Sequence, residues 1–359
     1  MFSPKQKSST RLGQSVEILN PITDDRWDDL VARHPCASTF HHRGWLEALS
    51  RTYGYEPLAL TSTAADQPLS DGVVLCRVSS WITGTRLVSL PFADHCDPLL
   101  NDIGEYREFM EWLRVTHDLQ RYTYVELRPL SEVQNFGGGL QPSPTYCFHE
   151  LDIKASLEQI FRGLHRDSIQ RRIRRAEREQ LSYEAGRSEQ LVGDFFRLLL
   201  LTRRRHQLPP QPRIWFRNLV ECMGDHVTIR LARKNDAPIA ALLTLRHRSS
   251  VVYKYGCSDE KFHNLGAMPF LFWRLIEESK ASGAEKIDFG RSDLDNEGLI
   301  AFKDRFGTTR KLLTYYRYPN TEKGETLTNH GSQAIRQFLS ILPDAILSTA
   351  GRVLYRHIG

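Results

Sequence analysis

The sequence lacks any long apolar run. No stretch of its 359 residues approaches the roughly 20 apolar residues that a membrane-spanning helix needs. Residues 1–14 are polar and lack the apolar centre of a secretory signal peptide, so we expect a short disordered leader and no export. The sequence therefore predicts a cytoplasmic protein.

Cysteine is scarce, and its spacing excludes the usual metal and redox motifs. The six cysteines form no CxxC pair and no Cys/His cluster of zinc-binding type; they are Cys36, Cys76, Cys96, Cys147, Cys222 and Cys257. Free thiols in a reducing compartment are the simplest interpretation. We expect no disulfide and no structural metal.

Excess charge is small, at +5, but it is unevenly placed. Arginines crowd residues 162–178, and Arg171, Arg172 and Arg175 are candidates for binding an anionic group of a substrate, such as a phosphate. A solvated helix face is the alternative interpretation. No aromatic residues interleave with these arginines, which argues against an RNA-binding motif, and we expect no DNA partner.

Strand-like and helix-like patterns alternate up to about residue 320. Strand patterns lie at 16–19, 57–61, 73–78, 86–90, 122–127, 146–151, 181–184, 227–232, 239–246, 250–256, 286–289 and 311–318. Helical patterns begin near residue 23 and lie at 45–53, 106–119, 156–179, 191–201, 267–280 and 298–306. This mixed order predicts an α/β (α+β) fold with helices covering a sheet, and the repeated rhythm indicates two domains of one type.

Residues 321–359 form a linker and a helical tail. Ile346, Ala350, Val353 and Leu354 fall on one stripe of a final helix that Asp344 could cap. Two interpretations stay open. The helix packs back on the body of the protein, or it lies at an anionic membrane surface.

Several segments carry a resemblance to a known family. YKYGCSD (253–259), NLGAMP (264–269), IDFGRSD (287–293) and AFKDRFG (301–307) are similar to the GNAT-superfamily domain of Fem-type aminoacyltransferases and of polysaccharide-associated acetyltransferase-like proteins. FHHRGW (40–45) and LPFADHCDP (90–98) resemble segments of the latter group. The resemblance implies two tandem GNAT-like domains, at 15–150 and 151–320, each a mixed sheet flanked by helices.

The resemblance also implies an activity. The chain is expected to be an acyl- or aminoacyl-transferase in which an amine attacks an activated acyl group directly, with no tightly bound cofactor. The acyl donor would be aminoacyl-tRNA or acetyl-CoA, so tRNA is one expected partner. The acceptor would be a small-molecule or lipid-linked cell-envelope precursor, from peptidoglycan or exopolysaccharide, with peripheral contact at the inner face of the cell membrane.

Two other functions stay open: an acetyl-CoA-dependent N-acetyltransferase acting on an amino sugar, and a non-catalytic module that binds RNA or an anionic membrane.

One loop bears on the identity of the acyl donor. In the acetyl-CoA form of this fold, a Gln or Arg, a Gly and a Gly or Ala line the pyrophosphate, and this chain has His263, Gly266 and Met268 there. Gly266 and Ala267 still allow close backbone approach at a helix N-terminus, where anions are favoured. CoA use is therefore in question.

The catalytic candidates lie in the same motifs. By the resemblance, Lys303 would contact phosphates or the reacting ester, where its charge would stabilise an oxyanion; an exposed surface lysine is the alternative. Arg291 could grip a phosphate and Asp293 could accept a proton, unless Arg291 forms an ion pair with Asp293 or Asp288.

Two further candidates lie in the first half of the chain, and one in the second. His95, beside Asp94, could act as a base, or both could hydrogen-bond within a loop. Tyr255, within the first of the four motifs, is assigned to substrate binding by the resemblance.

Overall fold

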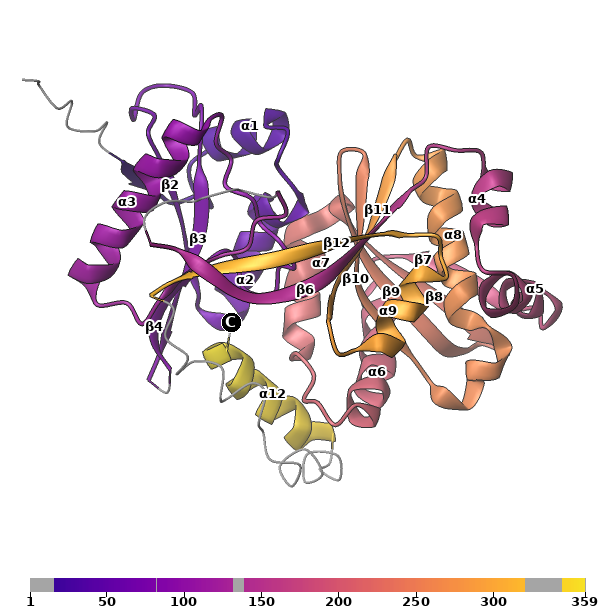
Figure 1. Cartoon of the computed structure of the whole chain (residues 1–359). Helices are drawn as coiled ribbons and strands as arrows, with labels where there is room; N and C mark the ends of the chain where they lie inside the picture. Colours follow the sequence, from indigo (N-terminus) through magenta and orange to yellow (C-terminus); the bar gives the residue numbers. More distant parts are fainter. Residues whose placement is uncertain (1–15, 82, 132–138, 320–343, 359) are drawn as a thin grey trace, which may run out of the picture.

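The computed structural model describes residues 16–81, 83–131, 139–319 and 344–358. Their strands form one twelve-stranded sheet with the order β1-β2-β3-β4-β5-β12-β6-β11-β10-β9-β8-β7. Figure 1 shows two lobes, joined by two long strands that run between them. The predicted mixed α/β architecture is confirmed.

The first lobe is built from the N-terminal part of the chain. Its strands are β1 (Glu17–Leu19), β2 (Glu56–Thr61), β3 (Val73–Ser80), β4 (Gly84–Val88) and β5 (Val125–Leu127). Its helices are α1 (Arg26–Arg33), α2 (Arg43–Tyr53) and α3 (Ile103–Gln120), with the 3-10 turn η1 (Thr39–His41). Helix α2 ends, as predicted, at Gly54, which adopts the left-handed conformation of a helix C-cap (φ 71°).

The second lobe contains the remaining strands and most of the helices. Its strands are β6 (Gln141–Asp152), β7 (Ser182–Gly186), β8 (Val227–Lys234), β9 (Ala237–His247), β10 (Ser250–Ser258), β11 (Lys286–Asp293) and β12 (Thr309–Tyr318). Its helices are α4 (Leu157–Gly163), α5 (Arg171–Arg178), α6 (Glu189–Arg205), α7 (Arg213–Met223), α8 (Ala267–Ala281) and α9 (Glu297–Asp304), with the π-helical segment η2 (Arg166–Gln170) and the 3-10 segments η3 (Gly224–His226) and η4 (Glu260–Leu265).

Alternation along β9 divides the core of the second lobe into two layers. Ala240 and Leu242 pack with α5 and α8 on one face, whereas Leu243 and Leu245 pack with α6 and α7 on the other. Successive strand residues point to opposite faces, so a strand buried on both faces is apolar throughout. The sheet is therefore covered by helices on both sides.

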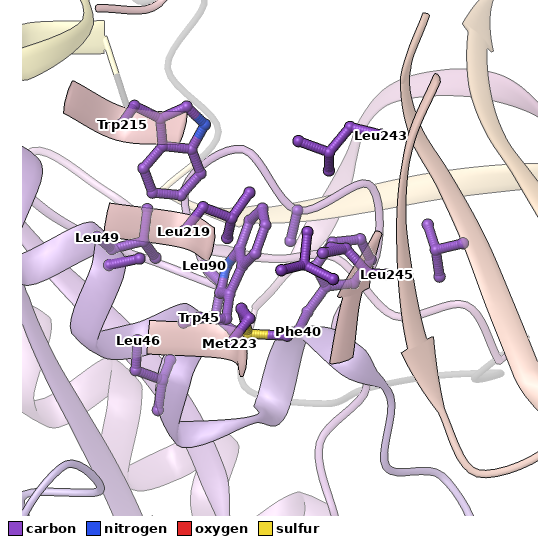
Figure 2. Packing of buried hydrophobic residues seen from close by; sticks show 14 of the residues in the cluster. Phe40, Trp45, Leu46, Leu49, Leu90, Trp215, Leu219, Met223, Leu243 and Leu245 are labelled. Atoms are coloured by element: carbon purple, nitrogen blue, oxygen red, sulfur yellow. The ribbon is translucent and has the colours of Figure 1, made fainter. Parts of the chain in front are cut away.

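The two lobes share a hydrophobic core where α2 meets α7. Figure 2 shows Trp45 and Leu49 of α2 beside Trp215 and Leu219 of α7. The rings of Trp45 and Trp215 meet edge to face, with centroids 5.3 Å apart. The lobes are also joined through the sheet, because β12 pairs with β5 on one side and with β6 on the other.

One predicted element differs in the structure, and one helix was not predicted. The long basic helix expected at 156–179 is divided into α4, η2 and α5: α4 ends at Gly163, the poorest helix former after proline, and His165 caps the next segment by accepting from the backbone N–H of Ser168. Helix α7 was not predicted. It starts directly after Pro212, at the end of a proline-rich stretch that reads as a loop, and Pro is well suited to the start of a helix.

The tail helix α12 (Asp344–Ile358) packs back on the body, as the first of the two interpretations predicted. The Tyr355 hydroxyl donates to the Pro209 carbonyl at 3.0 Å, and Arg86 donates to the His357 carbonyl at 2.7 Å. The predicted contact stripe is wrong for Val353 and Leu354, whose side chains are exposed. Ile346 and Ala350 lie outside the described side chains. No helix in the described part of the chain is long and apolar enough to cross a bilayer.

Candidate active site

The sheet opens between β10 and β11. These parallel strands pair only from Ser250 to Val252 and from Lys286 to Asp288, although both continue further. Each strand bulges where the pairing stops: the β10–β9 register shifts between Tyr253 and Tyr255, and the β11–β6 register shifts at the residue before Gly290. Bulges bend a strand and re-aim its side chains. We call the resulting wedge the splay.

An ion pair from opposite lobes lies beside the splay. Lys254, at the β10 bulge, places its Nζ 3.0 Å from Oδ1 of Asp94, which lies in the loop after β4. The two side chains are only 7% and 16% exposed. Burial alone would raise the pKa of the Asp94 carboxyl, but the charges of Lys254 and Arg291 outweigh it and lower that pKa. Asp94 is therefore ionised at neutral pH.

A second pair links the same loop to β11. His95 Nε2 lies 2.8 Å from Asp288 Oδ2, and both side chains are buried. A carboxylate only accepts, so Nε2 carries the proton and donates it. Burial lowers the pKa of His95, but the hydrogen bond to Asp288 and its charge outweigh this and raise it above the ordinary value. His95 and Asp94, predicted together, thus each hold a partner from the second lobe.

Lys303 completes this group of charges. Its side chain is buried, and Nζ donates to the carbonyls of Gly290 (2.9 Å) and Arg291 (3.0 Å). Burial lowers the pKa of Lys303 to about 8, although the Asp94 and Asp288 carboxylates oppose this change. The alternative of an exposed surface lysine is wrong.

Gly290 allows these groups to approach one another. It adopts φ 69°, which disfavours any side chain, and a Cβ there would lie 2.6 Å from Oδ2 of Asp94. Its N–H donates to Asp288 Oδ1 at 2.6 Å, while its carbonyl accepts from Lys303. One glycine therefore contacts three of the charged groups. We call the set Asp94, His95, Lys254, Asp288 and Lys303 the charged cluster.

The predicted substrate-binding residue Arg291 and the predicted catalytic residue Asp293 are placed differently. The Arg291 guanidinium lies over the rings of Tyr146 and Tyr315, at 4.0 Å and 5.2 Å from their centroids. Among the described ion pairs, Arg291 contacts neither Asp293 nor Asp288. Asp293 is exposed at the end of β11.

Tyr255 and Cys96 are both buried near this region. The Tyr255 hydroxyl accepts a hydrogen bond from Trp215 Nε1 at 3.1 Å, and its ring lies 5.8 Å below Lys254 Nζ. Burial raises the pKa of the Cys96 thiol well above its ordinary value, so this thiol stays protonated and is a poor nucleophile.

A cavity of about 320 Å³ lies where α8 begins. It is lined by Ser258 and Asp259 at the end of β10, by Ala267 at the first position of α8, and by Phe302, the neighbour of Lys303. We call it the α8 cavity. The N-terminus of a helix carries unpaired N–H groups that favour an anion.

The basic residues around this cavity are not equivalent. Arg172 lines it, whereas Arg171 and Arg175 form exposed ion pairs with Asp167 and Glu179. The predicted close approach at Gly266 is present, because a Cβ there would lie 2.3 Å from the Arg172 carbonyl oxygen. Of the three predicted arginines, only Arg172 is placed to reach a ligand in the α8 cavity.

Two members of the charged cluster were not predicted as site residues. Lys254 interrupts the apolar strand sequence VVYKYGC, and Asp288 similarly lies inside the buried segment KIDFG. A charge within a strand buried on both faces needs a partner, and that is the signal that could have identified both residues.

Residues 164–303 match the family model described as an acetyltransferase (GNAT) domain. The second lobe carries a GNAT domain. This match and the mixed α/β architecture support the resemblance inferred from the motifs. No curated protein sequence matches the chain significantly.

Solved structures show the same fold at low sequence identity. FemX has a TM-score of 0.65 and 14% identity, over 84% of this chain and 97% of FemX. The C-terminal domain of a putative lysylphosphatidylglycerol synthetase from Agrobacterium fabrum has a TM-score of 0.56 and 13% identity, over 83% and 91% of the two chains. A tandem GNAT protein from the clavulanic acid biosynthesis pathway has a TM-score of 0.52 and 13% identity, over 84% and 98%.

The GNAT domain sets what can be expected at this site. Such domains act on an acyl donor, for example acetyl-CoA, and hold no tightly bound cofactor. Within the ranges that the structure describes, no group of three or more His, Cys, Asp or Glu side chains is arranged to hold a metal ion. The titratable side chains gathered beside the splay are Lys254, Lys303, His95 and the carboxylates of Asp94 and Asp288.

Proposed function

We propose that this chain is an acyl- or aminoacyl-transferase whose reaction takes place at the splay. The observation that carries the proposal is the splay itself, with a buried lysine of lowered pKa and a His–Asp pair beside it and a helix-terminus cavity nearby. Perturbed titratable groups next to a cavity are typical of active sites.

The reaction would be a direct transfer. The amine nitrogen attacks the acyl carbonyl, a C–N bond forms, and the bond to the sulfur or oxygen of the donor breaks. The amine loses one proton, which Nδ1 of His95 would accept, and the leaving atom takes up one proton. With a pKa of about 8, Lys303 is mostly protonated at pH 7, so its charge is available to stabilise the oxyanion.

The donor would lie in the α8 cavity. Arg172 and the N-terminus of α8 favour a phosphate there, as a nucleotide-bearing donor would require. Aminoacyl-tRNA and acetyl-CoA both satisfy this chemistry. His263 and Met268, which replace the residues expected around a CoA pyrophosphate, favour aminoacyl-tRNA.

The acceptor would be an amine on a cell-envelope precursor from peptidoglycan or exopolysaccharide, either a small molecule or lipid-linked. The likeness to FemX and to a putative lysylphosphatidylglycerol synthetase domain supports an acceptor of this class. We further propose a cytoplasmic protein with peripheral membrane contact. The exposed Val353 and Leu354 of α12, beside the exposed Arg352, are suited to an anionic lipid surface.

The decisive experiment offers both donors to the protein and identifies the product by mass spectrometry. Aminoacyl-tRNA or acetyl-CoA is incubated with a lysine-containing stem peptide or with an amino sugar. The expected product is an N-acylated acceptor, formed at least tenfold more slowly by Lys303→Met. Transfer from acetyl-CoA alone would select the N-acetyltransferase alternative. No transfer from either donor to any acceptor, with RNA or vesicle binding intact, would favour the non-catalytic module.

A further inference from the structure

A second cavity, of about 360 Å³, lies between the two lobes. The first lobe contributes Cys36, Thr39, His95 and Asp97, and the second contributes His247, Lys286 and Asp288, among others. We call it the interlobe cavity. The interlobe cavity lies along the first residues of β10 and β11, where these strands are paired. The α8 cavity lies at the other end of β10.

The fixed charges around the interlobe cavity balance. Apart from its two histidines, it is lined by three cations, Arg248, Lys286 and Lys311, and by three anions, Asp97, Glu150 and Asp288. Several are already engaged: Lys286 pairs with Glu150 at 2.9 Å, and Arg248 donates to the carbonyls of Val31 and His34. A cavity without excess charge gives no advantage to a phosphorylated ligand over a neutral one.

Three buried polar atoms of its lining residues have no hydrogen-bond partner within the described ranges. They are Thr39 Oγ1, His95 Nδ1 and His247 Nε2. Burial lowers the pKa of His247 to about 4, so this ring is neutral at pH 7. A buried polar atom without a partner costs free energy, so three around one cavity indicate that partners arrive from outside the chain.

These atoms also indicate what kind of partner fits. The neutral His247 ring has one nitrogen that donates and one that accepts, His95 Nδ1 accepts whenever that ring is neutral, and the threonine hydroxyl both donates and accepts. Ligand hydroxyl groups satisfy all three atoms, because a hydroxyl also donates and accepts. A carboxylate or phosphate offers only acceptors.

We propose that the interlobe cavity binds an uncharged, hydroxyl-rich ligand, and that this ligand is the body of the acceptor. The second part rests on the proposed function, because the cavity shares His95 and Asp288 with the charged cluster. The first part does not, since binding requires no donor and no turnover.

The first test is calorimetry with two probes that differ at one position, where a neutral hydroxyl is replaced by a charged phosphate. N-acetyl-D-glucosamine is the neutral probe, and its 6-phosphate is the charged one. The neutral sugar is expected to bind, the phosphate to bind at least tenfold more weakly, and Thr39→Val to weaken the neutral sugar several-fold. Ser168→Ala, in the α8 cavity, is the matched control and should leave its affinity unchanged.

Cys36 provides a second test that needs no core substitution. It lines the interlobe cavity and is exposed, whereas four of the other five cysteines are buried and Cys222 is half-buried. The neutral sugar is expected to slow alkylation of Cys36 by N-ethylmaleimide but not that of Cys222, as peptide mass spectrometry would show. Prior alkylation should abolish sugar binding by the native chain but should leave sugar binding by Cys36→Ser unchanged.

The outcomes separate the two proposals. Equal or tighter binding of the phosphate, or no binding of the neutral sugar together with no protection of Cys36, would overturn the ligand class assigned to the interlobe cavity. In another outcome, the sugar binds and protects Cys36, but alkylation of Cys36 leaves the transfer rate unchanged. That result would support the binding site but overturn its role as the acceptor site. If the native chain binds the sugar but transfers no acyl group from either donor, only the proposed function would be contradicted.

Discussion

Lys254 and Asp94 are 160 residues apart in the sequence, yet their charged atoms lie 3.0 Å from one another beside the splay. One comes from the second lobe and the other from the first. Each is the partner that allows the other to be buried as an ion. Their contact therefore ties the relative position of the lobes to the electrostatics of the candidate active site.

The first prediction concerns this ion pair. Lys254→Met or Asp94→Asn alone should lower the free energy of unfolding by roughly 3–5 kcal/mol, because each leaves a buried charge without its partner. The double variant should be less destabilised than the sum of the two. Urea denaturation of the four proteins in a double-mutant cycle measures the coupling. Additive losses would show that the two charges are not coupled.

Lys303 is expected to act on the reaction more than on the fold. Lys303→Met, which keeps the volume of the side chain, should reduce single turnover at least tenfold with a small change in melting temperature. Phe306→Ala is the contrasting variant. Its ring is buried against Phe272 and Phe289, so its loss should cost roughly 3–5 kcal/mol of stability. Unchanged turnover in Lys303→Met would remove this residue from the mechanism.

A third prediction follows from the lowered pKa of Lys303. Its value is about 8 in the folded protein against 10.5 for an ordinary lysine, so between these pH values the unfolded chain binds more protons than the folded one. The contribution of this residue to stability should therefore rise with pH from about 8 to 10.5. Turnover should fall over the same range, as the ammonium is lost.

The comparison that isolates this effect is Lys303→Met. The free energy of unfolding and the single-turnover rate are measured from pH 7 to 10. In this variant, neither should show the pH dependence that the titration of Lys303 produces in the native chain. A native rate that stays constant to pH 10 would show that the charge of Lys303 is not used.

Arg172 and Arg171 provide a matched pair of neighbouring arginines. Arg172→Ala should weaken binding of a pyrophosphate-bearing donor several-fold, and the loss should shrink at high salt. Arg171→Ala should have little effect, because this side chain pairs with Asp167 and does not line the α8 cavity. Titration calorimetry at two salt concentrations distinguishes them. Equal effects would indicate a diffuse basic surface.

The last prediction concerns the donor. Titration with acetyl-CoA should show no binding tighter than high micromolar, because His263 and Met268 replace the residues expected around the CoA pyrophosphate. His263 is already engaged, with Nε2 2.9 Å from Ser258 Oγ. A low-micromolar dissociation constant would contradict this prediction and favour the N-acetyltransferase alternative.

The sequence alone determined most of the elements and the GNAT resemblance. Strands such as 227–232 and 250–256, and the helix at 267–280, were predictable because each is a run of local hydrophobic pattern between clear breaks. The motif around Lys303 pointed to a GNAT-type protein, and the LPFADHCDP segment pointed to Asp94 and His95. Helix α7 was missed because the proline-rich stretch directly before it has the pattern of a loop, so its first residue carries no clear start signal.

Tertiary structure alone decided which of these residues meet. The insertion of β12 between β5 and β6, the pairing of His95 with Asp288 and that of Asp94 with Lys254 all join segments far apart in the chain. Local patterns report whether a residue lies on a strand, but they do not report which strands are neighbours. The interlobe cavity has no sequence signature for the same reason: it exists only where residues of both lobes surround one space.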